Sequence, residues 1–198
     1  MYFSHSITAW FVDMNNNEYF LVQHTLSINL QSVEQHELPH DQLAFENEIP
    51  GPFRMASDLS AADASILAPL KLNSDNTHAL WAYLQAQNQK INTLLSYVLT
   101  QQDESHARYQ TLKFSAGSLI IKFDPRWKVD ETVRLKIFLP EESAAIYCYA
   151  TVSAVNETEC AFTYTLIREQ DRELLIRASL HVQSQQLKQR AKQRELNP

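Results

Sequence analysis

The hydrophobic pattern of this chain changes its period near residue 105, and that change limits the folds that the chain can adopt. From Thr77 to Gln102 there is no Gly or Pro, and apolar residues recur about every 3.5 residues, which predicts one long helix. From Thr111 to Leu166 the alternation has a period of two, which predicts several short, mostly antiparallel strands. A second long helix is expected from Arg168 to about Arg194, with acidic residues in its first turn and basic residues in its last turns.

The first long helix carries a seam that is typical of helices that associate with one another. Counted in sevens, apolar residues fill most positions of two adjacent rows. The rows are Thr77, Leu84, Ile91 and Val98, and Leu80, Gln87, Leu94 and Gln101. The residues expected to drive oligomerisation, to a dimer or a tetramer, are Leu80, Leu84, Ile91, Leu94 and Val98. A single amphipathic helix lying on its own domain is the alternative that the pattern leaves open.

Composition excludes several classes of site. The chain of 198 residues has two glycines, Gly51 and Gly117, so it cannot build the glycine-rich loops that cradle phosphates in nucleotide-binding enzymes. No combination of nucleophile and base argues for catalysis, and we expect no enzyme and no cofactor. Two cysteines are too few for a disulfide framework or a zinc cluster. If the strands on either side of residues 156–159 form a hairpin, Cys160 lies opposite Val155 and not opposite Cys148.

Charge is unevenly distributed along the chain. Residues 1–110 hold 12 acidic and 4 basic residues, which argues against broad binding of nucleic acid. Four basic residues crowd the C-terminal end, and we interpret them as a solvated helix end that complements the helix dipole: Lys188, Arg190, Lys192 and Arg194. No apolar run reaches 18 residues and the first residues do not resemble a signal peptide, so we expect a cytoplasmic protein without membrane insertion.

Residues 36–40 read His-Glu-Leu-Pro-His, which matches the zinc-protease signature in letters. That signature requires both histidines on one face of a helix, and Pro39 removes a helical hydrogen bond and clashes with the preceding turn. We therefore expect no metal centre here, and at most incidental binding by His36, His40 and Asp41.

The chain divides into four predicted parts. Residues 1–75 form an N-terminal extension, with a hairpin from Ile7 to Leu30 that turns at 15–17, an acidic loop at 31–57 and a short helix from Ser60 to Pro69. Residues 76–104 are the heptad helix, residues 105–167 a β-barrel, and residues 168–198 the C-terminal helix. The aromatic side chains on the outward rows of the barrel strands are expected to be covered by the long helices: Phe138, Tyr147 and Tyr149.

Three stretches in sequential order resemble the PilZ domain family. Residues 113–119 read Lys-Phe-Ser-Ala-Gly-Ser-Leu, residues 129–140 read Val-Asp-Glu-Thr-Val-Arg-Leu-Lys-Ile-Phe-Leu-Pro, and residues 167–175 read Ile-Arg-Glu-Gln-Asp-Arg-Glu-Leu-Leu. The resemblance covers about residues 105–190. It implies a mixed α+β fold, a six-stranded antiparallel β-barrel flanked by long helices. The heptad helix is similar to the atypical, tetramer-forming branch of the family.

The resemblance also implies where cyclic di-GMP would bind. In the family, an Arg-x-x-x-Arg stretch and an Asp/Asn-x-Ser-x-x-Gly stretch hold this ligand. Here Ser115 and Gly117 fall in the second stretch, Lys113 replaces the acidic or amide residue, and no two arginines upstream of Ser115 have the family's spacing. Two interpretations stay open: the site is lost, or it is rebuilt from Lys113, Arg108, Arg126 or a neighbouring chain.

The expected function is therefore signalling and not chemistry. The resemblance implies an adaptor in bacterial motility, biofilm formation or control of type IV pili, which works with a protein partner as a homo-oligomer. The alternative is a ligand-free structural module whose heptad helix is its working part.

Overall fold

The computed structural model describes residues 19–58 and 75–196. Its strands are β1 (Val22–Gln23), β2 (Ser27–Ser32), β3 (Arg108–Phe114), β4 (Ser118–Lys122), β5 (Thr132–Leu139), β6 (Ala144–Val155) and β7 (Glu159–Leu166). Its helices include α1 (Gln42–Glu48), α3 (Asp75–Thr100) and α4 (Glu169–Leu196), and residues 51–58 are also helical. Short 3₁₀ turns are η1 (Gln35–Glu37), η2 (Ser105–Ala107) and η3 (Pro140–Glu142).

The strands form a closed antiparallel barrel. The hydrogen-bonded order is β3-β2-β5-β6-β7-β4, and pairing between β4 and β3 closes the ring. The short strand β1 lies beside β3 next to β2, so β1 and β2 act as one interrupted strand. The alternating residues Val133, Leu135 and Ile137 of β5 are fully buried inside. The six-stranded barrel with flanking helices expected from the sequence is confirmed, and so is the pairing of Val155 with Cys160.

Residues 22–32 are part of the barrel, where the sequence suggested an extension before it. Ser27 pairs with Gln110 of β3, and Leu30 pairs with Leu135 of β5. The reason is that a barrel needs a strand between β3 and β5, and this segment is the one that supplies it. The other arm of the expected hairpin and the expected helix from Ser60 lie outside the described residues.

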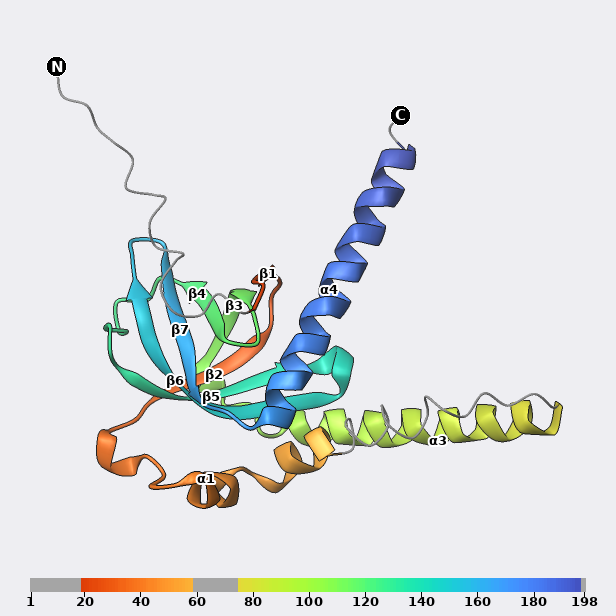
Figure 1. The fold of residues 1–198 in the computed structure, drawn as a ribbon, viewed down its shortest axis with the longest axis horizontal. Coiled ribbons are helices and arrows are strands. Elements are labelled where there is room, and N and C mark those ends of the chain that lie inside the picture. Colours follow the sequence, from red (N-terminus) through yellow and green to blue (C-terminus); the bar gives the residue numbers. More distant parts are fainter. Residues whose placement is uncertain (1–18, 59–74, 197–198) are drawn as a thin grey trace.

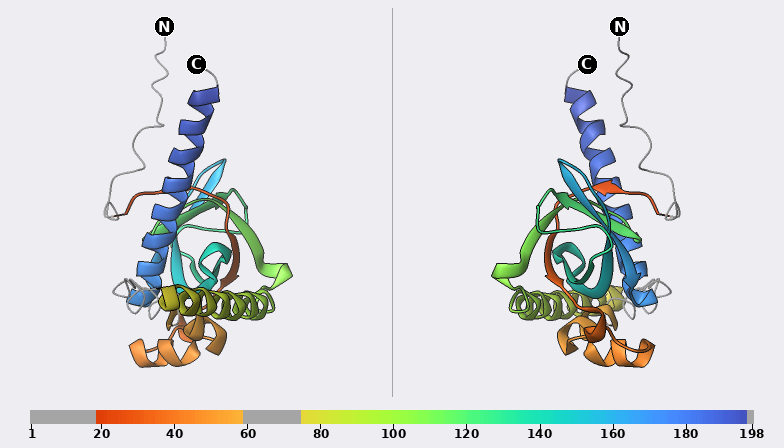
Figure 2. Two further views of the ribbon diagram at one scale, coloured as in Figure 1. Left: turned by 90° about the vertical axis from the view of Figure 1, so that its right-hand side faces the viewer. Right: turned by 90° about the vertical axis from the view of Figure 1, so that its left-hand side faces the viewer.

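The two long helices leave the barrel in different directions (Figure 1). Helix α3 is about 39 Å long, and its last turns pack on the barrel through the buried residues Leu95 and Leu99. Helix α4 packs along the barrel through Leu174, Leu175 and Val182, and its C-terminal half continues past the strands, as the side views in Figure 2 also show. Among the residues described, no helix has both the length and the apolar composition that crossing a membrane requires.

The aromatic outer face of β5 and β6 is covered by residues 42–58, and not by the long helices as the sequence suggested. Phe45 and Phe53 are fully buried against Tyr147, with ring centroids 6.3 and 6.4 Å away. Phe45, Ile49 and Phe53 recur every four residues and form an apolar row, although prolines and acidic residues made this segment look like a loop. Glu48 accepts hydrogen bonds from the hydroxyls of Tyr147 and Tyr149, at 2.5 and 2.6 Å.

A buried ion pair joins this cover to the start of α4. Arg168 donates two hydrogen bonds to Asp171, from Nε to Oδ2 at 2.8 Å and from the guanidinium NH₂ to Oδ1 at 2.9 Å. Ser57 donates a third hydrogen bond to Oδ1 of Asp171 at 2.5 Å. Because all three residues are buried, each polar group depends on the others for its hydrogen bonds.

Candidate ligand site and oligomerisation helix

The turn between β3 and β4 contains two residues of the predicted ligand site, Ser115 and Gly117. Its geometry is held by Ser115, whose backbone N–H donates to the carbonyl of Ser118 at 2.8 Å. The hydroxyl oxygen of Ser115 accepts from the backbone N–H groups of Gly117 and Ser118 at 3.1 and 3.0 Å. Ser115 is buried, so its hydroxyl serves the turn.

Arg172 of α4 donates a hydrogen bond to this turn, and sequence reasoning did not select it. Its guanidinium donates to the carbonyl of Ala116 at 2.9 Å and lies 5.7 Å from the centre of the Tyr19 ring. The signal was present in the Asp-Arg pair at residues 171–172, which was used only to recognise the start of a helix. The spatial closeness could not be deduced from residues that lie so far apart in the chain.

Each of the three basic candidates has an acidic partner. Lys113 lies 3.4 Å from Glu159. Arg108 and Lys113 lie at opposite ends of β3, about 17 Å apart at the rise of a strand. The remaining pairs are Arg108 with Asp103 at 2.7 Å and Arg126 with Asp124 at 3.1 Å.

The pKa values of Asp103 and Asp124 are both lowered, which agrees with their pairings with arginine. Burial alone raises the pKa of Asp103, but hydrogen bonds from Arg108 and Asn29 outweigh it and hold the pKa below its usual value. Asp103 is therefore ionised and paired at neutral pH. The guanidinium of Arg108 is correspondingly occupied, which reduces what it can offer to a phosphate.

Arg126 belongs to a cluster with Tyr109 and Asp124. The Tyr109 hydroxyl donates to Asp124 Oδ2 at 3.1 Å and accepts from the Arg126 guanidinium, which lies 5.4 Å from the ring centre of Tyr109. Burial and the neighbouring carboxylate raise the pKa of Tyr109 to about 12, so it stays protonated. Each of these three side chains therefore contacts the other two, where the β4–β5 loop meets β3.

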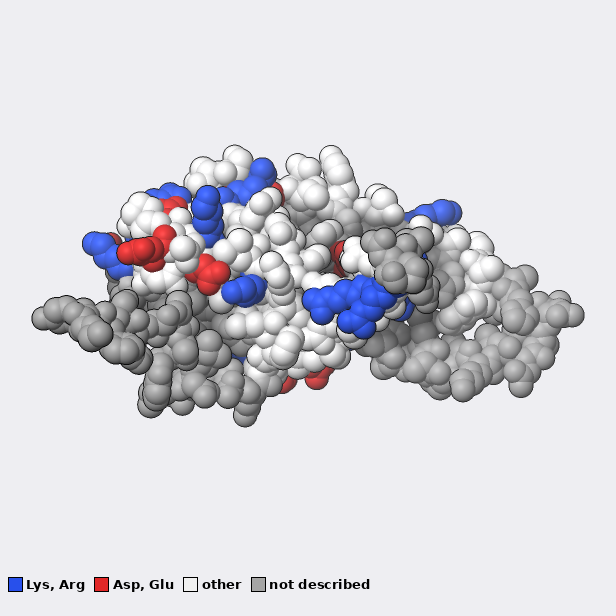
Figure 3. Space-filling model, turned by 90° about the horizontal axis from the view of Figure 1, so that it is seen from above, with Lys and Arg blue, Asp and Glu red and all other residues white. Residues whose placement is uncertain are grey.

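Positive charge is dispersed among the described residues of the face shown in Figure 3. Seen from above, Lys and Arg side chains form several separate groups on this face, with acidic side chains near some of them (Figure 3). A surface that binds nucleic acid gathers its basic side chains into one patch or stripe. Among the described residues on this face, the basic side chains form no such patch.

Helix α3 exposes its predicted seam in the single chain. Leu84 and Leu94 are 43% and 67% exposed, although leucine is usually buried. The residues that pack on the barrel, Leu95 and Leu99, lie beside the seam rows, and the residues of the seam itself stay exposed within the chain. The exposed large apolar residues of this helix are Leu80, Tyr83, Leu84, Ile91, Leu94, Tyr97 and Val98.

The histidines of residues 36–40 do not lie on one helix. His36 is in the 3₁₀ turn η1, and Asp41 caps α1 by accepting from the backbone N–H of Ala44 at 2.7 Å. Over residues 19–58 and 75–196, no group of three or more His, Cys, Asp or Glu residues is arranged to hold a metal ion.

Comparison with known proteins identifies a family model and solved structures that this chain resembles. The PilZ domain family model matches residues 84–181. Among solved structures, a pathogenic protein from Xanthomonas campestris, a tetrameric PilZ domain self-assembled via a helical bundle, is 12% identical with a TM-score of 0.54, over 87% of this chain and 92% of that one. The Bacillus subtilis inhibitor of motility MotI/DgrA is 15% identical with a TM-score of 0.43, over 89% of this chain. This chain spans about half of MotI/DgrA, 54% of its length. No curated protein matches the sequence.

Proposed function

This chain belongs to the PilZ domain family, and from that premise we propose that it is a non-enzymatic adaptor that self-associates through α3. The observation that carries the proposal is the exposed seam of α3, which projects from the barrel with its large apolar side chains in solvent. Exposed apolar patches of this kind mark sites of association. The Xanthomonas campestris protein of similar fold assembles through a helical bundle, which supports the same use of a helix here.

The composition of the seam suggests what specifies the assembly. Lys90 is the single charged residue between Leu80 and Thr100, whereas several positions carry Gln or Asn. Coiled coils often select partners by charges beside the seam, and this helix has too few for that mechanism. We infer that apolar burial and amide hydrogen bonds hold the helices together.

Raising the ionic strength should therefore leave the oligomer intact. Salt screens exposed ion pairs but does not weaken apolar burial, so the mass measured by light scattering in 1 M NaCl should equal the mass at about 0.1 M. Dissociation to single chains at high salt would contradict an apolar seam and indicate association through charges elsewhere.

We further propose that the adaptor works without cyclic di-GMP. The family's arginine stretch lies upstream of the serine motif, and the two arginines before Ser115 in this chain, Arg54 and Arg108, are 54 residues apart. Residues 1–21 contain no Lys or Arg, and the first basic residue along the chain is Arg54. The basic side chains near the Ser115 turn are engaged with protein groups, as described above. These observations favour a barrel that recognises a protein partner in place of the nucleotide.

Titration of cyclic di-GMP into the full chain, with EDTA present, tests this proposal. We expect no binding heat and an unchanged oligomeric mass by light scattering. A PilZ protein that retains both family motifs is the positive control. Micromolar or tighter binding would contradict the proposal. In that case, Lys113→Ala and Arg126→Ala, compared with Lys122→Ala at an exposed position of β4, would locate a rebuilt site.

By resemblance, the process served is bacterial motility, biofilm formation or pilus control. A strain without this protein should then be altered in surface motility. Complementation with the intact chain should restore it, and unchanged motility, biofilm and piliation together would contradict this assignment.

A further inference from the structure

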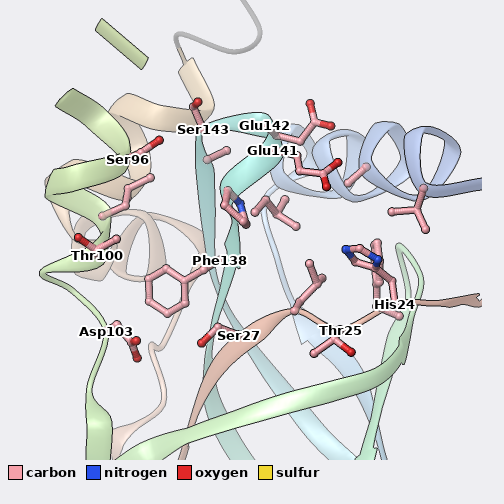
Figure 4. A pocket seen from close by; sticks show the side chains of 18 residues that line it. His24, Thr25, Ser27, Ser96, Thr100, Asp103, Phe138, Glu141, Glu142 and Ser143 are labelled. Carbon is pink, nitrogen blue, oxygen red and sulfur yellow. The ribbon is translucent and has the colours of Figure 1, made fainter. Parts of the chain in front are cut away.

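A cavity of about 260 Å³ lies at the end of the barrel where four elements meet. The break between β1 and β2, the last turns of α3, the loop at η3 and the middle of α4 all contribute to its lining (Figure 4). An engineered apolar cavity of about 150 Å³ binds benzene, so this one has room for a single ring with a short chain. The family motif at Ser115 is not part of its lining.

The walls of the cavity are apolar. Side chains from the barrel and from both long helices contribute, and seven of them are buried: Leu26, Leu99, Phe114, Leu139, Ala144, Ala178 and Val182. Transfer of an apolar body from water into such a space is favourable by about 25 cal/mol for each Å² removed from water.

The polar groups of the lining are hydroxyls, one imidazole and carboxylates. Ser96 and Thr100 of α3 contribute hydroxyls, and His24 lies across the cavity from them (Figure 4). None of the residues that line the cavity is Lys or Arg, so no permanently charged side chain there would pair with an anionic ligand.

Three carboxylates give the lining of the cavity a negative charge. Asp103 already pairs with Arg108 and Asn29. Glu142 contacts His181 at 3.1 Å, and Glu141 accepts from Gln185 at 3.2 Å. The two glutamates therefore have no Lys or Arg partner among the contacts described, and they favour a cation at the mouth.

We propose that this cavity binds a small molecule with an apolar body and an amino group. The body lies among Leu26, Leu99 and Val182, and the ammonium group lies near Glu141 and Glu142. Such a ligand would contact the last turns of α3, which also carry the seam. The inference does not depend on oligomerisation, because the cavity is complete within one chain.

Three probes with one phenyl body separate the contributions of shape and charge. Phenethylamine, 2-phenylethanol and phenylacetate are titrated into the full chain and followed by protein NMR shifts. We expect phenethylamine to bind about tenfold more tightly than phenylacetate, with the alcohol between them. Equal or tighter binding of phenylacetate would overturn the proposal, and so would the absence of binding by all three.

Variants locate the site and its charge. Ala178→Phe fills the cavity and should abolish binding, whereas Ala191→Phe, on the exposed part of the same helix, should not. If Ala178→Phe does not fold, Thr100→Trp at the exposed mouth serves the same purpose. The double variant Glu141→Gln, Glu142→Gln should remove most of the preference for the amine, and Glu157→Gln in the β6–β7 turn should keep it. The assignment would be overturned if the Ala178→Phe variant bound phenethylamine as tightly as the parent. It would also be overturned if the double glutamine variant kept the full preference for phenethylamine over phenylacetate.

Discussion

Replacing Leu84 and Leu94 of α3 by Asp should convert the protein from an oligomer to single chains with a folded barrel. Each buried Leu contributes about 1.5–3 kcal/mol to association, and an unpaired carboxylate placed in an apolar seam costs several kcal/mol more. Both side chains are exposed in the single chain, so the barrel loses nothing by their replacement. Light scattering measures the mass, and thermal unfolding measures the stability of the barrel.

The matched control places the same charges on another face of the helix. Gln85 and Gln89 are exposed and lie outside the two seam rows, so Gln85→Asp with Gln89→Asp should leave the mass unchanged. An intact oligomer after replacement of both leucines would contradict the seam. If the single chains of the Leu84→Asp, Leu94→Asp variant still bind the protein partner, the barrel acts as an adaptor. If they no longer bind it, the protein is better described as an oligomerisation module.

Truncation of Asp171 to Ala should destabilise the protein by about 3–5 kcal/mol, because it leaves the guanidinium of Arg168 buried without its partner. Ser57 also loses its acceptor, which loosens the contact between residues 51–58 and α4. Urea unfolding followed by circular dichroism gives the free energy. The variant should lose its native structure at a much lower urea concentration than the parent.

Two further variants test whether the loss of stability comes from the unpaired charge of Arg168. Glu173→Ala removes an exposed carboxylate from the same helix and should change stability by less than about 0.5 kcal/mol. Replacing Arg168 and Asp171 together by Met and Leu should recover much of the loss, because no unpaired charge is left. An Asp171→Ala variant as stable as Glu173→Ala would show that the pair does not hold the helix start.

The local patterns of the sequence predicted the two long helices and the barrel strands after residue 105, but not the helices at residues 42–58. The heptad pattern of residues 77–102 identified α3, and the period of two in residues 132–139 identified β5 with its correct inward row. These predictions succeed because a helix or strand places its apolar side chains at fixed spacing along one face. The turn at residues 156–159 likewise determined that Val155 faces Cys160.

The tertiary structure decided what covers and pairs with those elements. The strand at residues 27–32 closes the barrel with partners far along the chain, and Phe45 and Phe53 cover the aromatic face that the long helices were expected to cover. Lys113 of β3 pairs with Glu159 of β7, on the other side of the neighbouring strand β4, which changes a candidate phosphate ligand into half of an ion pair. The sequence by itself determined the periodicity of each segment and the absence of basic residues before Arg54. Which surfaces meet depends on contacts between residues distant in the chain, and local spacing carries no information about those contacts.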